Sequence, residues 1–194
     1  MGGKLRIIGG KWRSRKIDFP DLPDLRPTTD RIRETLFNWL APYIVDANCL
    51  DLFAGSGALG FEALSRGAAQ VTFVDHSRYV VDKLRKNVEI LQATTNAQVL
   101  CGDFTSVIPF LTTTSYNIVF LDPPFYKNLV ERAALHLEES KLLAPNAFIY
   151  VETEKNLKPL PLPKTWKIYR EKATSSLAYY LFQHLPQKKG VEKG

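Results

Sequence analysis

The sequence predicts an α/β fold built on a doubly wound, mostly parallel β-sheet. From residue 48 onward, short β-rich runs alternate with stretches whose apolar residues recur at helical spacing. Strands that alternate with helices imply right-handed crossovers and parallel pairing. A glycine-rich segment, DLFAGSGALG at 51–60, joins the first strand of this series to its first helix. Ligands of such sheets bind at the carboxyl ends of the strands, so we expect the site there.

Length and composition restrict the class of protein. The chain has 194 residues, 45% of them apolar, and a net charge of +6, which favours one main domain and argues against disorder. No apolar stretch approaches the roughly twenty residues of a membrane span, and the basic start lacks the apolar core of a secretory signal. We therefore expect a cytoplasmic protein without membrane contact. Its histidines and cysteines form no metal-ligand cluster, and no coiled-coil segment argues against a monomer.

The N-terminal region, residues 1–27, is predicted to form a basic β-hairpin and a link. Leu5–Ile8 and Trp12–Ile17 are β-rich, and Gly9-Gly10 between them suits a turn. The first sixteen residues contain six cations and no acid. This clustering indicates a polyanion partner, although a solvated arm without a partner explains a charge run equally well. The candidate phosphate contacts are Lys11, Arg13, Arg15, Arg26, Arg31 and Arg33.

The main domain is predicted over 28–185, before a flexible tail at 186–194. Thr28–Asp30 can cap a helix whose apolar face continues to Tyr43. Strands follow at 49–53, 71–75, 97–103, 117–122 and 147–152, and helices at 58–66, 78–92, 106–111 and 128–137. Three residues join the strand-like runs 166–172 and 176–183, so these two should pair antiparallel.

The glycine-rich segment leaves the cofactor class open. Gly55, Gly57 and Gly60 have the G-x-G-x-x-G spacing, and Asp75 lies twenty residues after Gly55, as in a dinucleotide site. S-Adenosylmethionine needs the same close backbone approach and the same acceptor for its ribose hydroxyls. These residues alone therefore fit either NAD or the methyl donor.

Three further residues favour S-adenosylmethionine. A fixed negative charge at Asp51 would contribute little to the binding of a pyrophosphate, but it complements the positive ammonium and sulfonium groups of the methyl donor. Asp103 can accept a hydrogen bond from the adenine amino group, and Phe104 offers an adjacent apolar surface. Alternatively, both aspartates only satisfy the backbone of turns.

The segment Asp122-Pro123-Pro124-Phe125 carries the strongest signal. The prolines restrict the backbone, so the Asp122 carboxylate and the Pro123 carbonyl become fixed acceptors. An exocyclic amine of a nucleobase is a poor nucleophile, and two acceptors on its hydrogens can aim its lone pair at a methyl group. Phe125 can stack on the unstacked base. A purely structural turn after the strand is the other interpretation.

The chain resembles class I S-adenosyl-L-methionine-dependent methyltransferases of Rossmann-like fold. DLFAGSGALG matches their donor loop, and DPPF matches the motif of enzymes that methylate exocyclic amines. GGKWRSRKI and RPTTDRIRETLFNWL extend the resemblance to the bacterial 16S rRNA (guanine(966)-N2)-methyltransferase family, from about Lys4 to Phe182.

This resemblance implies a seven-stranded sheet with one antiparallel strand, and methyl transfer to guanine N2 in 16S rRNA of an assembling 30S subunit. It also implies roles for individual residues. The basic hairpin and the start of the first helix would contact phosphates, and DPPF would hold the target guanine. The donor site would be lined by Asp51, Phe53, Gly55, Gly57, Asp75, Asp103 and Phe104.

Three rival functions stay open. An adenine-N6 DNA methyltransferase would share the donor loop and DPPF, but the chain has no segment large enough for a separate DNA-recognition domain. A nicotinamide-dependent dehydrogenase would explain the glycines and Asp75 but not DPPF or the basic arm. A non-catalytic RNA-binding module would explain only the arm.

Overall fold

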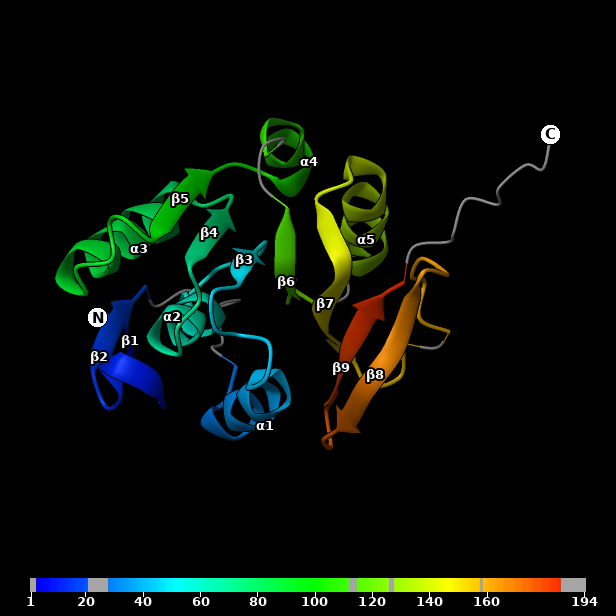
Figure 1. Ribbon diagram of the computed structural model, residues 1–194, viewed down its shortest axis with the longest axis horizontal. Coiled ribbons are helices and arrows are strands. Elements are labelled where there is room, and N and C mark those ends of the chain that lie inside the picture. The colour runs from blue at the N-terminus through cyan, green and yellow to red at the C-terminus, as the bar shows by residue number, and fades with distance from the viewer. Residues whose placement is uncertain (1–2, 21–27, 112–114, 126–127, 158, 186–194) are drawn as a thin grey trace.

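The computed structural model describes residues 3–20, 28–111, 115–125, 128–157 and 159–185. Within these residues the main sheet has seven strands, in the order β5-β4-β3-β6-β7-β9-β8 (Figure 1). The first five strands of this order run parallel, and β9 runs antiparallel to both of its neighbours. The prediction of a doubly wound, mostly parallel sheet with an antiparallel C-terminal strand is confirmed. The strands are β3 (Asn48–Asp51), β4 (Gln70–Asp75), β5 (Ala97–Cys101), β6 (Tyr116–Leu121), β7 (Leu143–Glu154), β8 (Trp166–Ala173) and β9 (Leu177–His184).

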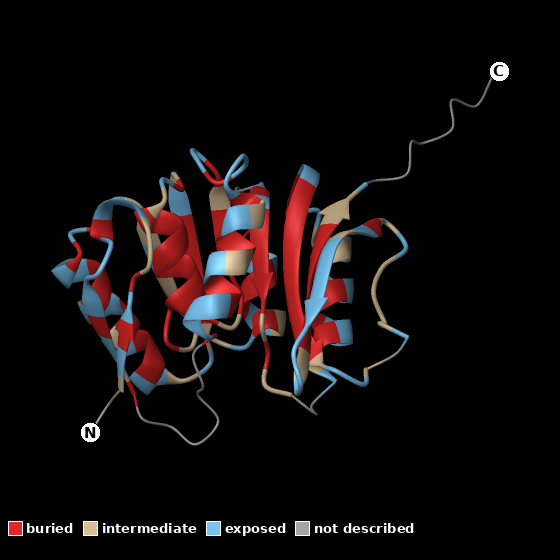
Figure 2. Cartoon of the chain, turned by 90° about the horizontal axis from the view of Figure 1, so that it is seen from below, coloured by how far each residue is buried: buried red, intermediate tan, exposed pale blue. Residues whose placement is uncertain are grey.

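Helices cover both faces of the sheet, as doubly wound topology requires. One face carries α1 (Asp30–Leu40), α2 (Ala58–Ser65) and α3 (Arg78–Ile90). The other face carries α4 (Phe104–Val107), the 3₁₀ helix η2 (Ile108–Phe110) and α5 (Leu129–Ser140). In Figure 2 the central strands are largely buried, while the helices also present exposed residues to solvent.

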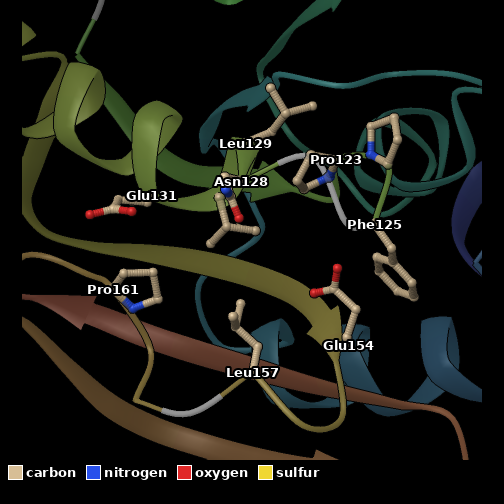
Figure 3. A pocket seen from close by; sticks show the side chains of 10 residues that line it. Pro123, Phe125, Asn128, Leu129, Glu131, Glu154, Leu157 and Pro161 are labelled. Carbon is tan, nitrogen blue, oxygen red and sulfur yellow. The ribbon is translucent and has the colours of Figure 1, made fainter.

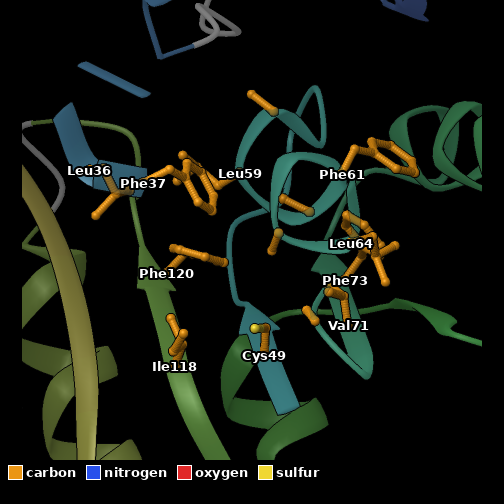
Figure 4. Packing of buried hydrophobic residues seen from close by; sticks show 14 of the residues in the cluster. Leu36, Phe37, Cys49, Leu59, Phe61, Leu64, Val71, Phe73, Ile118 and Phe120 are labelled. Carbon is orange, nitrogen blue, oxygen red and sulfur yellow. The ribbon is translucent and has the colours of Figure 1, made fainter. Parts of the chain in front are cut away.

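Aromatic side chains fill the space between the sheet and the first three helices. Phe37 of α1 lies 6.0 Å from Phe120 of β6, measured between ring centroids, and Phe61 of α2 lies 4.8 Å from Phe73 of β4 (Figure 4). A Cβ atom at Gly60 would collide with the Phe73 ring. The third glycine of the G-x-G-x-x-G spacing therefore allows α2 to pack closely on β4.

The N-terminal hairpin forms, but with different bounds from those predicted. β1 (Gly3–Arg6) pairs antiparallel with β2 (Lys16–Phe19), and Arg6 lies opposite Lys16. The prediction that a strand begins at Trp12 is wrong, because Trp12 lies in the 3₁₀ helix η1 (Gly10–Trp12).

Contacts with α2 explain this difference. The Trp12 N–H donates to Ser65 Oγ at 3.0 Å, so it bonds to a helix and not to a partner strand. Gly10 has φ +74°, and a Cβ atom there would collide with the Ser65 carbonyl. The connection between β1 and β2 is therefore shaped to lie against α2.

The hairpin shares its apolar core with the main sheet. Leu5, Ile7, Trp12 and Ile17 are buried in the same cluster as residues of α1, α2 and α3. The predicted domain boundary between residues 27 and 28 stays a prediction. The predicted link at 21–27 and tail at 186–194 lie outside the described residues. In the part of the chain that the structure describes, no helix has the length and apolar character needed to cross a membrane.

Candidate active site

The centre of the candidate site is Asp51, the last residue of β3. Because β3 pairs with β4 on one side and β6 on the other, the loops after these three strands meet at one edge of the sheet. Asp51 is 2% exposed, and its Oδ2 accepts the Gly60 N–H at 3.0 Å. Burial raises the pKa of Asp51 to about 7; the Gly60 hydrogen bond lowers it, and the charges of Asp122 and Asp75 raise it.

Asp75 ends β4 and holds the glycine-rich segment. Its Oδ2 accepts the Gly55 N–H at 2.9 Å, and its Oδ1 accepts the Ser77 N–H at 2.8 Å. Gly55 and Gly57 have φ +49° and +76°, values that favour glycine. A carboxylate has about four acceptor positions, so these two bonds leave Asp75 free to accept further hydrogen bonds.

Asp103 and Phe104 follow β5 and differ in exposure. Asp103 is exposed and caps α4, because its Oδ1 accepts the N–H and the hydroxyl of Thr105 at 2.9 and 2.7 Å. Burial raises the pKa of Asp103, but the Thr105 hydrogen bonds outweigh this effect and hold the pKa below its usual value.

Phe104, predicted to offer an apolar surface beside Asp103, lies inside the protein. Phe104 is 2% exposed, and its ring lies 5.6 Å from the ring of Phe53 and 5.5 Å from that of His136. Phe53 is half-buried, so its ring is the more accessible of the two. A role for either ring in binding a cofactor stays a prediction.

The DPPF segment follows β6 at the same edge of the sheet. Asp122 is half-buried, and its Oδ2 accepts the Thr28 hydroxyl at 3.1 Å. Burial raises the pKa of Asp122 to about 6, although the Thr28 hydrogen bond lowers it. Pro123, Pro124 and Phe125 line a pocket together with residues of α5, the end of β7 and the segment after it (Figure 3).

Two buried residues of β7, Glu152 and Tyr150, belong to this site although the sequence pattern did not single them out. Leu121 pairs with Val151, so Asp122 lies level with Glu152. The Tyr150 hydroxyl donates to Glu152 Oε2 at 2.7 Å. Burial and the charge of Asp122 raise the pKa of Glu152 to about 8, while the Tyr150 bond lowers it. The sequence feature that could have indicated Glu152 is a carboxylate near the carboxyl end of an apolar strand.

Comparisons with known proteins identify the family. A family model described as Conserved hypothetical protein 95 matches residues 5–183. Ribosomal RNA small subunit methyltransferase D of Escherichia coli strain K12 is 51% identical over 185 residues, which cover 95% of this chain and 92% of that protein. This chain belongs to the methyltransferase D family.

Two further comparisons agree with methyltransferase D. The protein of the same name from Haemophilus influenzae is 47% identical over 186 residues, covering 94% of this chain and 95% of that protein. A solved Escherichia coli structure described as a methyltransferase is 52% identical, with a TM-score of 0.85, and the match covers 95% of this chain and all of that one. The predicted enzyme class, a methyltransferase of class I fold, is confirmed.

In this member of the methyltransferase D family, the predicted phosphate-contact residues differ in their exposure to solvent and in their hydrogen bonds. Lys11, Arg13 and Arg31 are exposed. Arg15 is also exposed, and its guanidinium donates to the Ile90 carbonyl at 3.2 Å. Arg26 lies outside the described residues.

The prediction that Arg33 contacts phosphate is wrong. Its side chain is 0% exposed, and its guanidinium lies 2.6 Å from Asp30 Oδ1 and 3.5 Å from Glu62 Oε2. It also donates to the Arg6 carbonyl at 3.0 Å. Arg33 therefore joins the hairpin to α1 and α2 within this methyltransferase and cannot reach RNA.

Proposed function

We propose that this methyltransferase transfers a methyl group from S-adenosylmethionine to the exocyclic N2 of a guanine in 16S rRNA, within an assembling 30S subunit. The observation that carries the proposal is the position of the Asp122 carboxyl. It lies at the same sheet edge as the glycine-rich segment, in a chain closely related to small-subunit rRNA methyltransferases.

The charge of the sheet edge supports S-adenosylmethionine as the cofactor. Asp51 and Asp75 flank the glycine-rich segment, and a negative charge at Asp51 would repel a pyrophosphate. The methyl donor carries an ammonium and a sulfonium, which these carboxylates complement. We propose that Asp75 accepts from the ribose hydroxyls and Asp103 from the adenine amine, with Phe53, Gly55 and Gly57 beside them. When bound, the cofactor supplies an electrophilic methyl group.

The DPPF segment would bind the target amine. We propose that Asp122 and the Pro123 carbonyl accept hydrogen bonds from the two hydrogens of N2, which orients the nitrogen lone pair. Pro124 keeps this backbone rigid. Phe125 lines a pocket that follows Asp122 and would stack on the unstacked base.

Asp122 would also receive the proton that N2 loses when its new N–C bond forms. The pKa of an ordinary aspartate is about 3.9, which makes it a weak base. Burial raises the pKa of Asp122 to about 6, so this carboxylate is a better proton acceptor while it stays largely ionised near neutral pH. The same residue can therefore orient the amine and hold its proton.

The test combines three substrates with one variant. Wild-type protein and labelled S-adenosylmethionine are incubated separately with undermethylated 30S subunits, naked 16S rRNA and duplex DNA. We expect label in guanine N2 of the rRNA and none in DNA. Label in adenine of DNA would favour the adenine-N6 alternative, and no label in any substrate would reject the proposal.

Asp122→Asn should abolish transfer yet bind S-adenosylmethionine like wild type in calorimetry, because it removes the charge without changing the shape. Asp46→Asn is the matched control, since Asp46 is exposed and precedes the amino end of β3, away from the site. Equal methylation by Asp122→Asn and wild type would remove Asp122 from the mechanism.

A further inference from the structure

Thr28, the residue two before α1, contacts Asp122 from outside the sheet. Thr28 is 6% exposed, and its hydroxyl donates to Asp122 Oδ2 at 3.1 Å across 94 positions of sequence. This hydrogen bond restrains the orientation of the carboxylate, and among the residues that the structure describes no hydrogen bond to Oδ1 is found, so Oδ1 can accept one from a substrate.

The backbone of Thr28 is itself held in place. Its carbonyl accepts from Arg33 Nε at 3.2 Å. The planar Arg33 guanidinium is fixed in turn by Asp30 and by the Arg6 carbonyl of the hairpin. The backbone position of Thr28 therefore depends on a network centred on the buried Arg33 side chain.

We propose that Thr28 is a positioning residue for methyl transfer: its hydroxyl fixes Oδ2 of Asp122 so that Oδ1 meets the target amine in one orientation. This inference rests on the proposed function. Thr28 itself touches neither the amine nor the methyl donor in this scheme. Its effect passes through Asp122, so removing the hydroxyl should lower the rate of transfer more than the affinity for RNA.

The charges around Asp122 determine the direction of the pH effect. The groups that face it are Asp51 from β3, Glu152 and Tyr150 from β7, and Thr28 from the start of α1. The Thr28 hydrogen bond stabilises the ionised form and lowers the pKa of Asp122. Without this bond the pKa should rise, and the acidic limb of the rate profile should move to higher pH.

The experiment compares Thr28→Val, which removes the hydroxyl at nearly constant shape, with Thr28→Ser, which keeps it. Thr35→Val is the matched control, because the Thr35 hydroxyl bonds within α1, to the Arg31 carbonyl at 3.0 Å. Measured quantities are kcat and KM on undermethylated 30S subunits across pH. The pKa of Asp122 is measured separately by carbon NMR titration of the protein without cofactor or RNA.

For Thr28→Val we expect kcat to fall about tenfold or more, since the variant lacks a hydrogen bond to a charged group, with KM for the subunit unchanged. The pKa of Asp122 should rise, Thr28→Ser should restore most of the rate, and Thr35→Val should match wild type. An unchanged kcat and pKa would overturn the inference. So would a raised KM with kcat unchanged, which would make Thr28 an RNA contact.

The proposed function and the role of Thr28 can fail separately. If the wild-type protein transfers no methyl group to guanine, the proposed function is rejected, and the role of Thr28 in that reaction falls with it. If wild type is active and Thr28→Val has the same rate and pH profile, only the role of Thr28 is rejected.

Discussion

At the scale of single residues, burial gives ordinary aspartates unusual proton affinities. Asp51 ends β3 and is buried, and Asp122 directly follows the adjacent parallel strand β6 and is half-buried. Burial is the main cause that raises their pKa values to about 7 and about 6, and the charge of Asp122 contributes to the raised value of Asp51. A cation bound between these two carboxyls would lower their pKa values, as expected of a site that binds a positively charged donor.

Asp51 should make the stability of the protein depend on pH. Between its usual pKa and about 7, folded Asp51 keeps a proton that the unfolded chain has released. The free energy of unfolding should therefore fall as pH rises through this window, by about 1.4 kcal/mol per pH unit for one group. Asp51→Asn should flatten that slope, as measured by urea denaturation without cofactor.

The control is again Asp46→Asn, which changes an exposed carboxyl and should keep the wild-type slope. A slope in Asp51→Asn equal to that of wild type would show that folded Asp51 does not retain its proton in this window.

At the scale of elements, α1 separates two arginines that are close together in the sequence. Arg31 faces solvent, whereas Arg33 shares its helical face with the buried residues Leu36, Phe37 and Leu40. This i, i+3, i+4, i+7 spacing was visible in the sequence and could have indicated that Arg33 points inward. The spacing could not predict that Glu62 of α2 provides the carboxylate that compensates the buried charge of Arg33.

Arg33→Met should lower the free energy of unfolding by about 3–5 kcal/mol, because it leaves Glu62 and the Arg6 carbonyl without this partner. Arg31→Met, on the exposed side of the same helix turn, should change stability by less than about 0.5 kcal/mol. Urea denaturation of both variants measures the difference. Equal stability of the two would contradict the assigned role of Arg33.

The hairpin and its connection carry exposed cations suited to phosphate. Changing Arg13 and Arg15 to Gln should weaken rRNA binding and reduce the slope of log affinity against log salt by about 0.7–0.9 for each phosphate that is no longer neutralised. The control is a double variant on β8, at the far edge of the sheet, that removes the same number of positive charges: Lys167→Gln with Lys172→Gln (Figure 1). An unchanged slope in the Arg13 and Arg15 variant would leave the hairpin without that role.

Local patterns explain why most elements could be predicted. Alternating apolar runs, the glycine-rich segment and the cap at Thr29 specify strands, a turn and a helix start by chemistry within a few residues. The bounds of the hairpin could not be predicted, because Trp12 bonds to Ser65, far away in sequence. The Thr28 contact to Asp122 escaped prediction for the same reason.

At the scale of the whole molecule, the hairpin and the sheet share one hydrophobic cluster. The fluorescence of Trp12 monitors the hairpin connection, and that of Trp166 monitors β8 at the far edge of the sheet. Trp12 and Trp166 lie in the clusters on opposite faces of the sheet, and β3, β4 and β6 contribute residues to both clusters, so we expect the two regions to unfold together.

Single-tryptophan variants test this expectation. One keeps Trp12 with Trp39→Phe and Trp166→Phe; the other keeps Trp166 with Trp12→Phe and Trp39→Phe. Their fluorescence transitions in urea should coincide with each other and with circular dichroism. An earlier transition at Trp12 would instead support an independent N-terminal unit, as the predicted boundary at residue 27 implies.

The row of carboxyls at Asp51, Asp122 and Glu152 has a consequence for how a nucleic acid can approach. The protein as a whole is cationic, with a net charge of +6, so a phosphate chain is attracted to it, but Asp122, which is largely ionised near neutral pH, repels that chain from this edge. An uncharged base can enter where its own backbone cannot. We therefore expect a nucleotide to approach this edge with its base turned inward and its phosphates outside.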